Sequence, residues 1–138
     1  MARRCAVQAL YQWQVNGGNV EEIYQQFLVE RNMKDVNVDM FKELLQGVTQ
    51  ELSSLDELIK PHIDREIEEV DPVERAVLRL GCYELKNKLD TPYRVVINEA
   101  LESVKLFGAE QGHRFINGVL DKVAQSTREL EFKRNARK

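Results

Sequence analysis

Three linked segments between residues 71 and 123 decide the fold of this chain, and the first begins Asp71-Pro72-Val73-Glu74-Arg75-Ala76-Val77-Leu78-Arg79. An aspartate before a proline, with a glutamate at the third helical position, is typical of a helix start and of a capping box. Val73, Val77 and Leu80 then share one helical face. The pattern predicts an amphipathic helix that begins at the Asp71 cap.

Thr91-Pro92 repeats the start signal, with the threonine hydroxyl as the expected cap, and Gly108 is the expected end of that second helix. The third segment runs from Glu110 to about Arg128. Apolar residues recur at helical spacing in both segments: Ile97, Ala100, Leu101, Val104 and Phe107 in one, and Phe115, Ile116, Val119, Leu120 and Val123 in the other.

The first half of the chain has the same periodicity. Helices are predicted over residues 3–15, 20–31 and 37–60, and the last of these, with the strongest periodicity, is the expected central helix. Alternating β-branched windows bounded by hairpin turns are absent. We therefore predict an all-α fold, a compact bundle of about seven helices within a single domain over residues 1–130, followed by a basic, disordered tail at residues 131–138.

Composition limits the class of protein. The chain has 138 residues, no run of the roughly 20 apolar residues that a membrane helix needs, and no signal-peptide pattern at its start, which predicts a cytoplasmic protein. Cys5 and Cys82 are too few for a disulfide framework and are expected to be reduced, buried thiols.

Charge is distributed unevenly. Residues 51–75 hold nine acidic and three basic side chains, whereas residues 126–138 hold five basic and two acidic ones, and Arg3 and Arg4 make the other end basic. The ends therefore suit an anion, and the middle suits a basic partner.

The sequence contains no signature of catalysis or cofactor binding. His62 and His113 lie far apart, neither stands at metal-ligand spacing from a cysteine or carboxylate, and no glycine-rich phosphate loop is present. We expect no metal, no cofactor and no enzyme activity.

Binding remains, and each candidate has a structural alternative. Arg3 and Arg4 at a helix start oppose the helix dipole, so they either bind a phosphate or are simply solvated. Phe115, beside Arg114, either stacks on an unpaired base or belongs to the core. The acidic stretch faces either a basic protein or only water.

The chain resembles the NusB family of bacterial transcription antitermination factors over nearly its whole length. The matching stretches are Cys5-Ala6-Val7-Gln8-Ala9-Leu10-Tyr11, Arg75-Ala76-Val77-Leu78-Arg79, Tyr83-Glu84-Leu85, Ile97-Asn98-Glu99-Ala100, Phe107-Gly108 and Phe115-Ile116-Asn117-Gly118-Val119-Leu120. The resemblance implies two three-helix bundles plus a short helix, and no catalysis. It also implies an RNA adaptor that binds the boxA element of ribosomal leader RNA with the ribosomal small-subunit protein NusE, in a complex with other Nus factors on RNA polymerase.

The resemblance also implies roles for nine residues. Those expected to contact RNA are Arg3, Arg4, Gln8, Gln111, Arg114 and Phe115. Those expected to face NusE are Tyr11, Glu68 and Glu74. Many family members carry a longer arginine-rich leader than the two arginines that precede Cys5 here, which predicts weak RNA affinity without the partner and a flatter salt dependence.

Two other readings stay open at this point. A similar helical domain forms the RNA-binding front part of ribosomal RNA cytosine methyltransferases, although such an enzyme also needs a cofactor-binding domain, whose glycine-rich fingerprint is absent here. A purely structural helical oligomer would require an exposed apolar patch, which these charged helices do not suggest.

Overall fold

The computed structural model describes residues 1–107 and 110–136, and within those ranges every regular element is a helix. The prediction of an all-α fold is thereby confirmed. The described residues form eight α-helices: α1 (Ala2–Asn16), α2 (Val20–Glu30), α3 (Val38–Gln50), α4 (Leu52–Ile59), α5 (Pro72–Asn87), α6 (Tyr93–Leu106), α7 (His113–Thr127) and α8 (Glu129–Ala136). Three short 3-10 helices, η1 (Lys60–His62), η2 (Ile67–Glu69) and η3 (Glu110–Gly112), lie in the connections.

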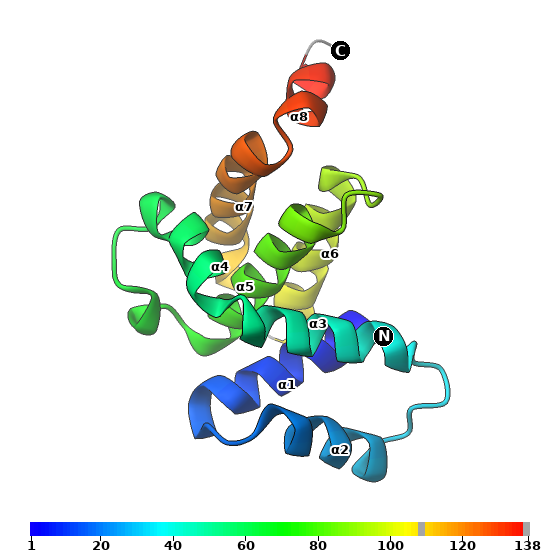
Figure 1. The fold of residues 1–138 in the computed structure, drawn as a ribbon. Coiled ribbons are helices and arrows are strands. Elements are labelled where there is room, and N and C mark those ends of the chain that lie inside the picture. The colour runs from blue at the N-terminus through cyan, green and yellow to red at the C-terminus, as the bar shows by residue number, and fades with distance from the viewer. Residues whose placement is uncertain (108–109, 137–138) are drawn as a thin grey trace.

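The helices form two groups, one above the other in Figure 1. Helices α1, α2 and α3 contact one another in the lower group, and α5, α6 and α7 contact one another in the upper group, with α4 against α5. Gly17 and Gly18 turn the chain between α1 and α2 with φ angles of 71° and 103°, a region that glycine enters without steric cost. This turn lies where the sequence predicts the end of the first helix.

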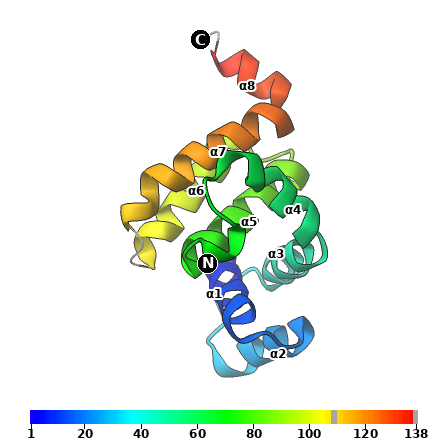
Figure 2. The same cartoon turned by 90° about the vertical axis from the view of Figure 1, so that its left-hand side faces the viewer.

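Helix α5, rather than the predicted helix over residues 37–60, is central. It contacts α1, α3, α4, α6 and α7, and it joins the two groups. Residues 76–85 of α5 are all buried. Figure 2 shows α5 enclosed between α4 on one side and α6 and α7 on the other.

The predicted helix over residues 37–60 is in fact two helices that meet at Glu51. The backbone of Glu51, with φ −102° and ψ 18°, lies outside the α-helical region. The Glu51 carboxylate accepts hydrogen bonds from Lys86 Nζ at 2.8 Å and Asn87 Nδ2 at 3.3 Å, both at the end of α5. The bend lets α3 and α4 each pack along α5, because apolar residues continue at helical spacing on both sides of it.

The predicted N-cap of α5 at Asp71 is confirmed, but the predicted capping box does not form, because the Glu74 side chain turns toward Gly112 instead of back to the Asp71 amide. Asp71 Oδ2 accepts hydrogen bonds from the amides of Val73 at 3.0 Å and Glu74 at 3.1 Å. The Glu74 side chain packs against Gly112 at the start of α7, so tightly that it occupies the space of a Cβ on that glycine. Glycine at position 112 therefore allows α5 and α7 to approach each other through Glu74.

The prediction that Thr91 caps the start of α6 is wrong. Pro92 occupies the N-cap position, which leaves the Thr91 hydroxyl one residue too early to cap. The amide of Tyr93 instead donates to Glu131 Oε1 of α8 at 2.8 Å. Helix α6 ends at Leu106, and the predicted end at Gly108 lies outside the described residues.

Residues 131–138 are predicted to be a disordered tail, but residues 131–136 belong to α8. Residues 137–138 lie outside the described part of the chain. Glu131 caps α6, and the Phe132 ring lies 5.4 Å from the Tyr93 ring, centroid to centroid. An ion pair between Glu129 and Lys133 supports the exposed face of the helix. These contacts order a segment whose composition alone predicts disorder.

Candidate nucleic-acid interface

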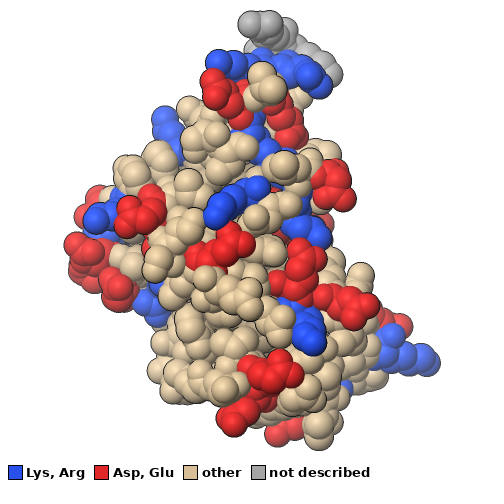
Figure 3. Space-filling view, viewed as in Figure 1, with Lys and Arg blue, Asp and Glu red and all other residues tan. Residues whose placement is uncertain are grey.

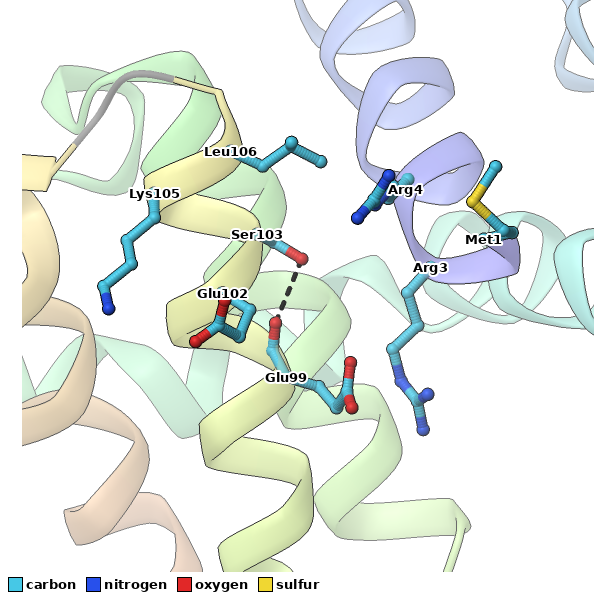
Figure 4. A pocket seen from close by; sticks show the side chains of 8 residues that line it. All are labelled: Met1, Arg3, Arg4, Glu99, Glu102, Ser103, Lys105 and Leu106. Atoms are coloured by element: carbon cyan, nitrogen blue, oxygen red, sulfur yellow. Dashed lines mark hydrogen bonds between the residues drawn. The ribbon is translucent and has the colours of Figure 1, made fainter.

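A groove of about 420 Å³ lies between the start of α1 and the second half of α6 (Figure 4). We call it the first groove. Its lining residues are Met1, Arg3, Arg4, Glu99, Glu102, Ser103, Lys105 and Leu106. The two arginines predicted to contact phosphate therefore stand on one wall of a real depression.

Arg3 is only partly available to a ligand. Its Nε donates to both carboxylate oxygens of Glu84 on α5, at 2.9 and 3.2 Å, and the Glu84 side chain is almost fully buried. Burial raises the pKa of Glu84, and the hydrogen bond from Arg3 opposes that rise. Arg3 therefore stabilises a buried carboxylate through Nε, which leaves the terminal amino groups of its guanidinium to face a phosphate. Neither sequence-based alternative, phosphate contact or solvation, included this ion pair.

Arg4 is exposed and points across the first groove toward α6 in Figure 4. Lys105 adds a second cation on the α6 wall, but the carboxylates of Glu99 and Glu102 lie on the same wall. The groove is thus of mixed charge, with Arg4 and the edge of Arg3 as the cations of its α1 wall and Lys105 as the cation of its α6 wall. It suits one or two phosphates rather than a long run of them.

A second groove, of about 510 Å³, follows α1 on the next turns. Its lining residues are Val7, Gln8, Tyr11, Gln12, Asn16, Arg31, Val73 and Phe107. Gln8, predicted to contact RNA, and Tyr11, predicted to contact the protein partner, share this groove, so the structure does not divide them between two surfaces. Tyr11 is 42% exposed.

Arg31 is a cation of the second groove that the sequence analysis missed. Its guanidinium donates to Gln8 Oε1 and lies 4.2 Å from the centroid of the Phe27 ring. The only sequence signal is the spacing of Arg31 four residues after Phe27 at a helix end, a common surface pattern. Its meeting with Gln8, 23 residues away, depends on how α2 packs against α1.

The start of α7 carries the remaining predicted RNA contacts. Gln111 in η3 and Arg114 in the first turn of α7 are exposed. Phe115 is half-buried, because it packs against the core with part of its ring. The Arg65 guanidinium lies over the ring, 4.6 Å from its centroid. The alternative in which Phe115 belongs to the core is therefore partly correct, since the ring lies at the edge of the core. The part of the ring outside the core lies beside a cation.

Glu74 lies close to this region rather than on a distant surface, since it packs against Gly112, three residues before Phe115. Burial raises the pKa of Glu74, as does the neighbouring Asp71 charge, while Arg65 lowers it. A cation on a partner protein would stabilise the ionised form of this half-buried carboxyl, because the cation offsets part of the cost of desolvating the charge.

Glu68, the third residue predicted to face the protein partner, lies on the connection between α4 and α5. A third groove there, of about 590 Å³, is lined by Ser53, Asp56, Glu57, Lys60, Ile63, Asp64, Arg65, Glu66, Ile67 and Glu68. Figure 3 shows acidic side chains gathered at the left edge of the molecule, where this connection lies. The surface is strongly acidic, which disfavours RNA and favours a basic protein.

The candidate residues form a chain of neighbouring sites. Leu106 lines the first groove and Phe107 the second, so the end of α6 joins them. Val73 lines the second groove, and its neighbour Glu74 packs against the start of α7. Arg65 then links Phe115 to the third groove. The fold thus brings residues from four separate stretches of sequence to adjoining positions around the starts of α1, α5 and α7.

The arrangement offers contacts rather than chemistry. Among residues 1–107 and 110–136, no three His, Cys, Asp or Glu side chains are placed to hold a metal ion, and no helix is long and apolar enough to cross a membrane. Cys5 and Cys82 are buried, and burial raises the pKa of both thiols, which disfavours the reactive thiolate.

Comparison with known proteins agrees with this geometry. The sequence profile of the NusB family matches residues 1–125. The transcription antitermination protein NusB of Shewanella loihica is 53% identical over 122 residues, which are 88% of this chain and 91% of that protein. The relatives that match this chain over most of their length are antitermination proteins, which agrees with the prediction of a function other than catalysis.

Solved structures share the fold. A NusB structure from T. maritima superposes with a TM-score of 0.82 at 31% identity, over 96% of this chain and 94% of that one. A crystal structure of the antitermination factors NusB and NusE in complex with double-stranded RNA gives a TM-score of 0.79 at 29% identity, over 91% of this chain and 94% of that one. By its sequence and by its fold, this chain belongs to the NusB family of transcription antitermination proteins.

Proposed function

We propose that this protein is an RNA-binding adaptor that recognises the boxA element of ribosomal leader RNA together with NusE. The resulting complex joins other Nus factors on RNA polymerase in the cytoplasm and suppresses premature termination. The observation that carries the proposal is the shared fold with a NusB that was solved with NusE and RNA, combined with adjoining cationic and acidic sites on this chain.

In this proposal RNA lies along the starts of α1 and α7. Arg4 and Arg114 are exposed cations for phosphates, Arg3 adds its terminal amino groups, and Phe115 offers part of a ring for an unpaired base. Gln8 and Gln111 add amide groups that read base edges or bind phosphate oxygens.

NusE is proposed to contact Tyr11, Glu74 and Glu68, which run from the second groove to the acidic third groove. Because Gln8 and Tyr11 line one groove, a partner at Tyr11 would stand next to RNA at Gln8. RNA and partner can then touch each other, which explains why the pair would bind more tightly than the free protein. We further propose that residues 1–130 act as one domain, on which the rest of α8 packs through Glu131 and Phe132.

The test is fluorescence anisotropy of a short boxA-like RNA and of a scrambled control, titrated with this protein alone and with purified NusE. We expect weak binding alone, and preference for boxA that sharpens when NusE is present. Equal affinity for both RNAs, even with NusE, would exclude the adaptor function. Repeating the titration at several salt concentrations measures how many phosphates are neutralised.

A further inference from the structure

The ring of Phe115 is half-buried, and a cation covers one side of it. Arg65, from the connection between α4 and α5, places its guanidinium 4.6 Å from the ring centroid. The remaining part of the ring packs against the core. A base that approaches Phe115 from the side of Arg65 therefore meets the guanidinium first.

Arg65 is held loosely enough to serve a ligand. Its side chain is 43% exposed, and its ion pair with Asp64 is long, at 3.7 Å, with the Asp64 side chain 92% exposed. Such surface pairs contribute little to stability. The contact with the ring, rather than the ion pair, thus fixes the position of the guanidinium.

A guanidinium is planar and always charged, and it is more weakly hydrated than an ammonium group. One face can lie on a phenyl ring while the other carries an unpaired base, because single-stranded RNA bases stack on arginine planes as well as on aromatic rings. Arg114, one residue before Phe115, provides an exposed cation beside this stack for the adjoining phosphate.

We infer that Arg65 is a further RNA-contacting residue, with its guanidinium stacked between the Phe115 ring and an unpaired base. The inference rests on the proposed function, since it requires RNA at the start of α7. It extends the RNA surface from α7 to the connection between α4 and α5, in a stretch whose acidic composition disfavours RNA.

It also places an RNA contact beside the proposed partner surface. Arg65 lines the third groove with Glu68 and lies near Glu74. A basic partner that neutralises these carboxylates makes the electrostatic potential around Arg65 less negative, which favours RNA at this position.

The test compares four forms of the full chain: wild type, Arg65→Ala, Arg65→Lys and Arg94→Ala. Arg94 is a matched control, because its guanidinium also lies over a ring, 5.8 Å from the centroid of Tyr93, beside α8. Dissociation constants are measured with a short single-stranded boxA-like RNA in the presence of NusE. Thermal melting shows that each variant is folded, which the exposure of both arginines leads us to expect.

We expect Arg65→Ala to weaken binding about 5- to 30-fold, the scale of one lost stacked base. Arg65→Lys should recover part of the loss, since it keeps the charge but not the plane, and Arg94→Ala should bind as wild type does. An abasic nucleotide placed at each RNA position in turn identifies the stacked base. At that position the abasic nucleotide should weaken RNA binding by the wild-type protein. It should weaken RNA binding by Arg65→Ala only a little, because this variant has already lost the stacking contact.

Two results would overturn the inference while leaving the proposed function intact. If Arg65→Ala binds like Arg94→Ala, the guanidinium only covers the ring. If Arg65→Ala binds more tightly than wild type, Arg65 is a lid that a base must displace. If wild type shows no preference for boxA even with NusE, the proposed function and this inference fail together.

Discussion

The guanidinium of Arg128, at the end of α7, donates from its Nε to the carbonyl oxygen of Leu85 in α5 at 2.7 Å. The same group donates to the carbonyl oxygens of Glu84 and Lys88, at 3.2 and 2.8 Å, and to that of Thr91 at 2.8 Å. Arg128 is 5% exposed and also pairs with Glu131 at 2.8 Å. One side chain thus binds the carbonyls at the end of α5 and, through Glu131, fixes the start of α6.

Replacement of Arg128 should therefore destabilise the upper group of helices strongly. We expect Arg128→Met, which keeps much of the apolar stem, to lower the free energy of unfolding by about 2 to 4 kcal/mol, because the carbonyls of Leu85 and Thr91 lose this donor. Urea unfolding followed by circular dichroism measures the change. Arg134→Met, at an exposed position of α8, is the control and should stay within about 0.5 kcal/mol of wild type. Equal effects of the two substitutions would show that Arg128 is dispensable.

Substitutions of Arg3 and Arg4 should both lower RNA affinity, but only the substitution of Arg3 should lower the stability of the fold. Arg3→Met removes the partner of buried Glu84 and should cost about 3 to 5 kcal/mol of stability near pH 8, whereas Arg4→Met should leave stability unchanged. Both should weaken RNA binding, which anisotropy measures under conditions where the variants are folded.

The loss of stability in Arg3→Met should also depend on pH. Burial raises the pKa of Glu84 above its unfolded value, so the folded state binds the proton more tightly. As the pH falls through the folded pKa toward the unfolded one, the carboxyl is protonated and the cost of burying its charge disappears. The destabilisation should thus shrink from about pH 8 to about pH 5. A pH-independent loss would show that the Glu84 charge is not its cause.

Two glycines provide a matched test of the packing of α5. A Cβ on Gly47 of α3 would overlap ring atoms of Tyr83, which is itself buried, so Gly47→Ala should destabilise by about 1 to 3 kcal/mol. A Cβ on Gly118 of α7 meets nothing within 4 Å, so Gly118→Ala should stabilise by about 0.5 to 1 kcal/mol through helix propensity. Melting temperatures should move in opposite directions. A shift in the same direction would contradict the assigned contact with Tyr83.

Glu74 should act through its charge on the protein partner. Glu74→Gln keeps the shape against Gly112 and removes the charge, and we expect it to weaken NusE binding about 3- to 30-fold while RNA binding by the free protein is kept. The substitution should not destabilise the protein at neutral pH, since burial raises the pKa of this carboxyl and its ionised form is a cost to folding.

Isothermal titration with purified NusE measures the Glu74→Gln effect, and Glu22→Gln on the exposed side of α2 is the charge-matched control. Glu74→Lys, which reverses the charge, should weaken NusE binding further. Unchanged NusE affinity in both Glu74 variants would remove Glu74 from the interface.

The sequence by itself determined those features that depend on neighbours along the chain. The Asp71 cap, the end of α1 and the apolar faces of the helices are predicted correctly, because each arises from contacts within about four residues. The matching stretches, taken together, also identified the family. Helix boundaries and the choice of central helix were less accurate, as the break at Glu51 shows.

Only the tertiary structure decided which side chains from distant segments meet. Glu131 caps α6 from 38 residues away, Arg3 reaches Glu84 across 81 residues, and Arg65 covers Phe115 from a different connection. No local pattern encodes these pairs, because each depends on the angles and distances at which whole helices pack on α5. The family resemblance implies Arg3 and Phe115 as RNA contacts, but only helix packing decides that Arg3 also pairs with the buried carboxylate of Glu84 and that Arg65 covers Phe115.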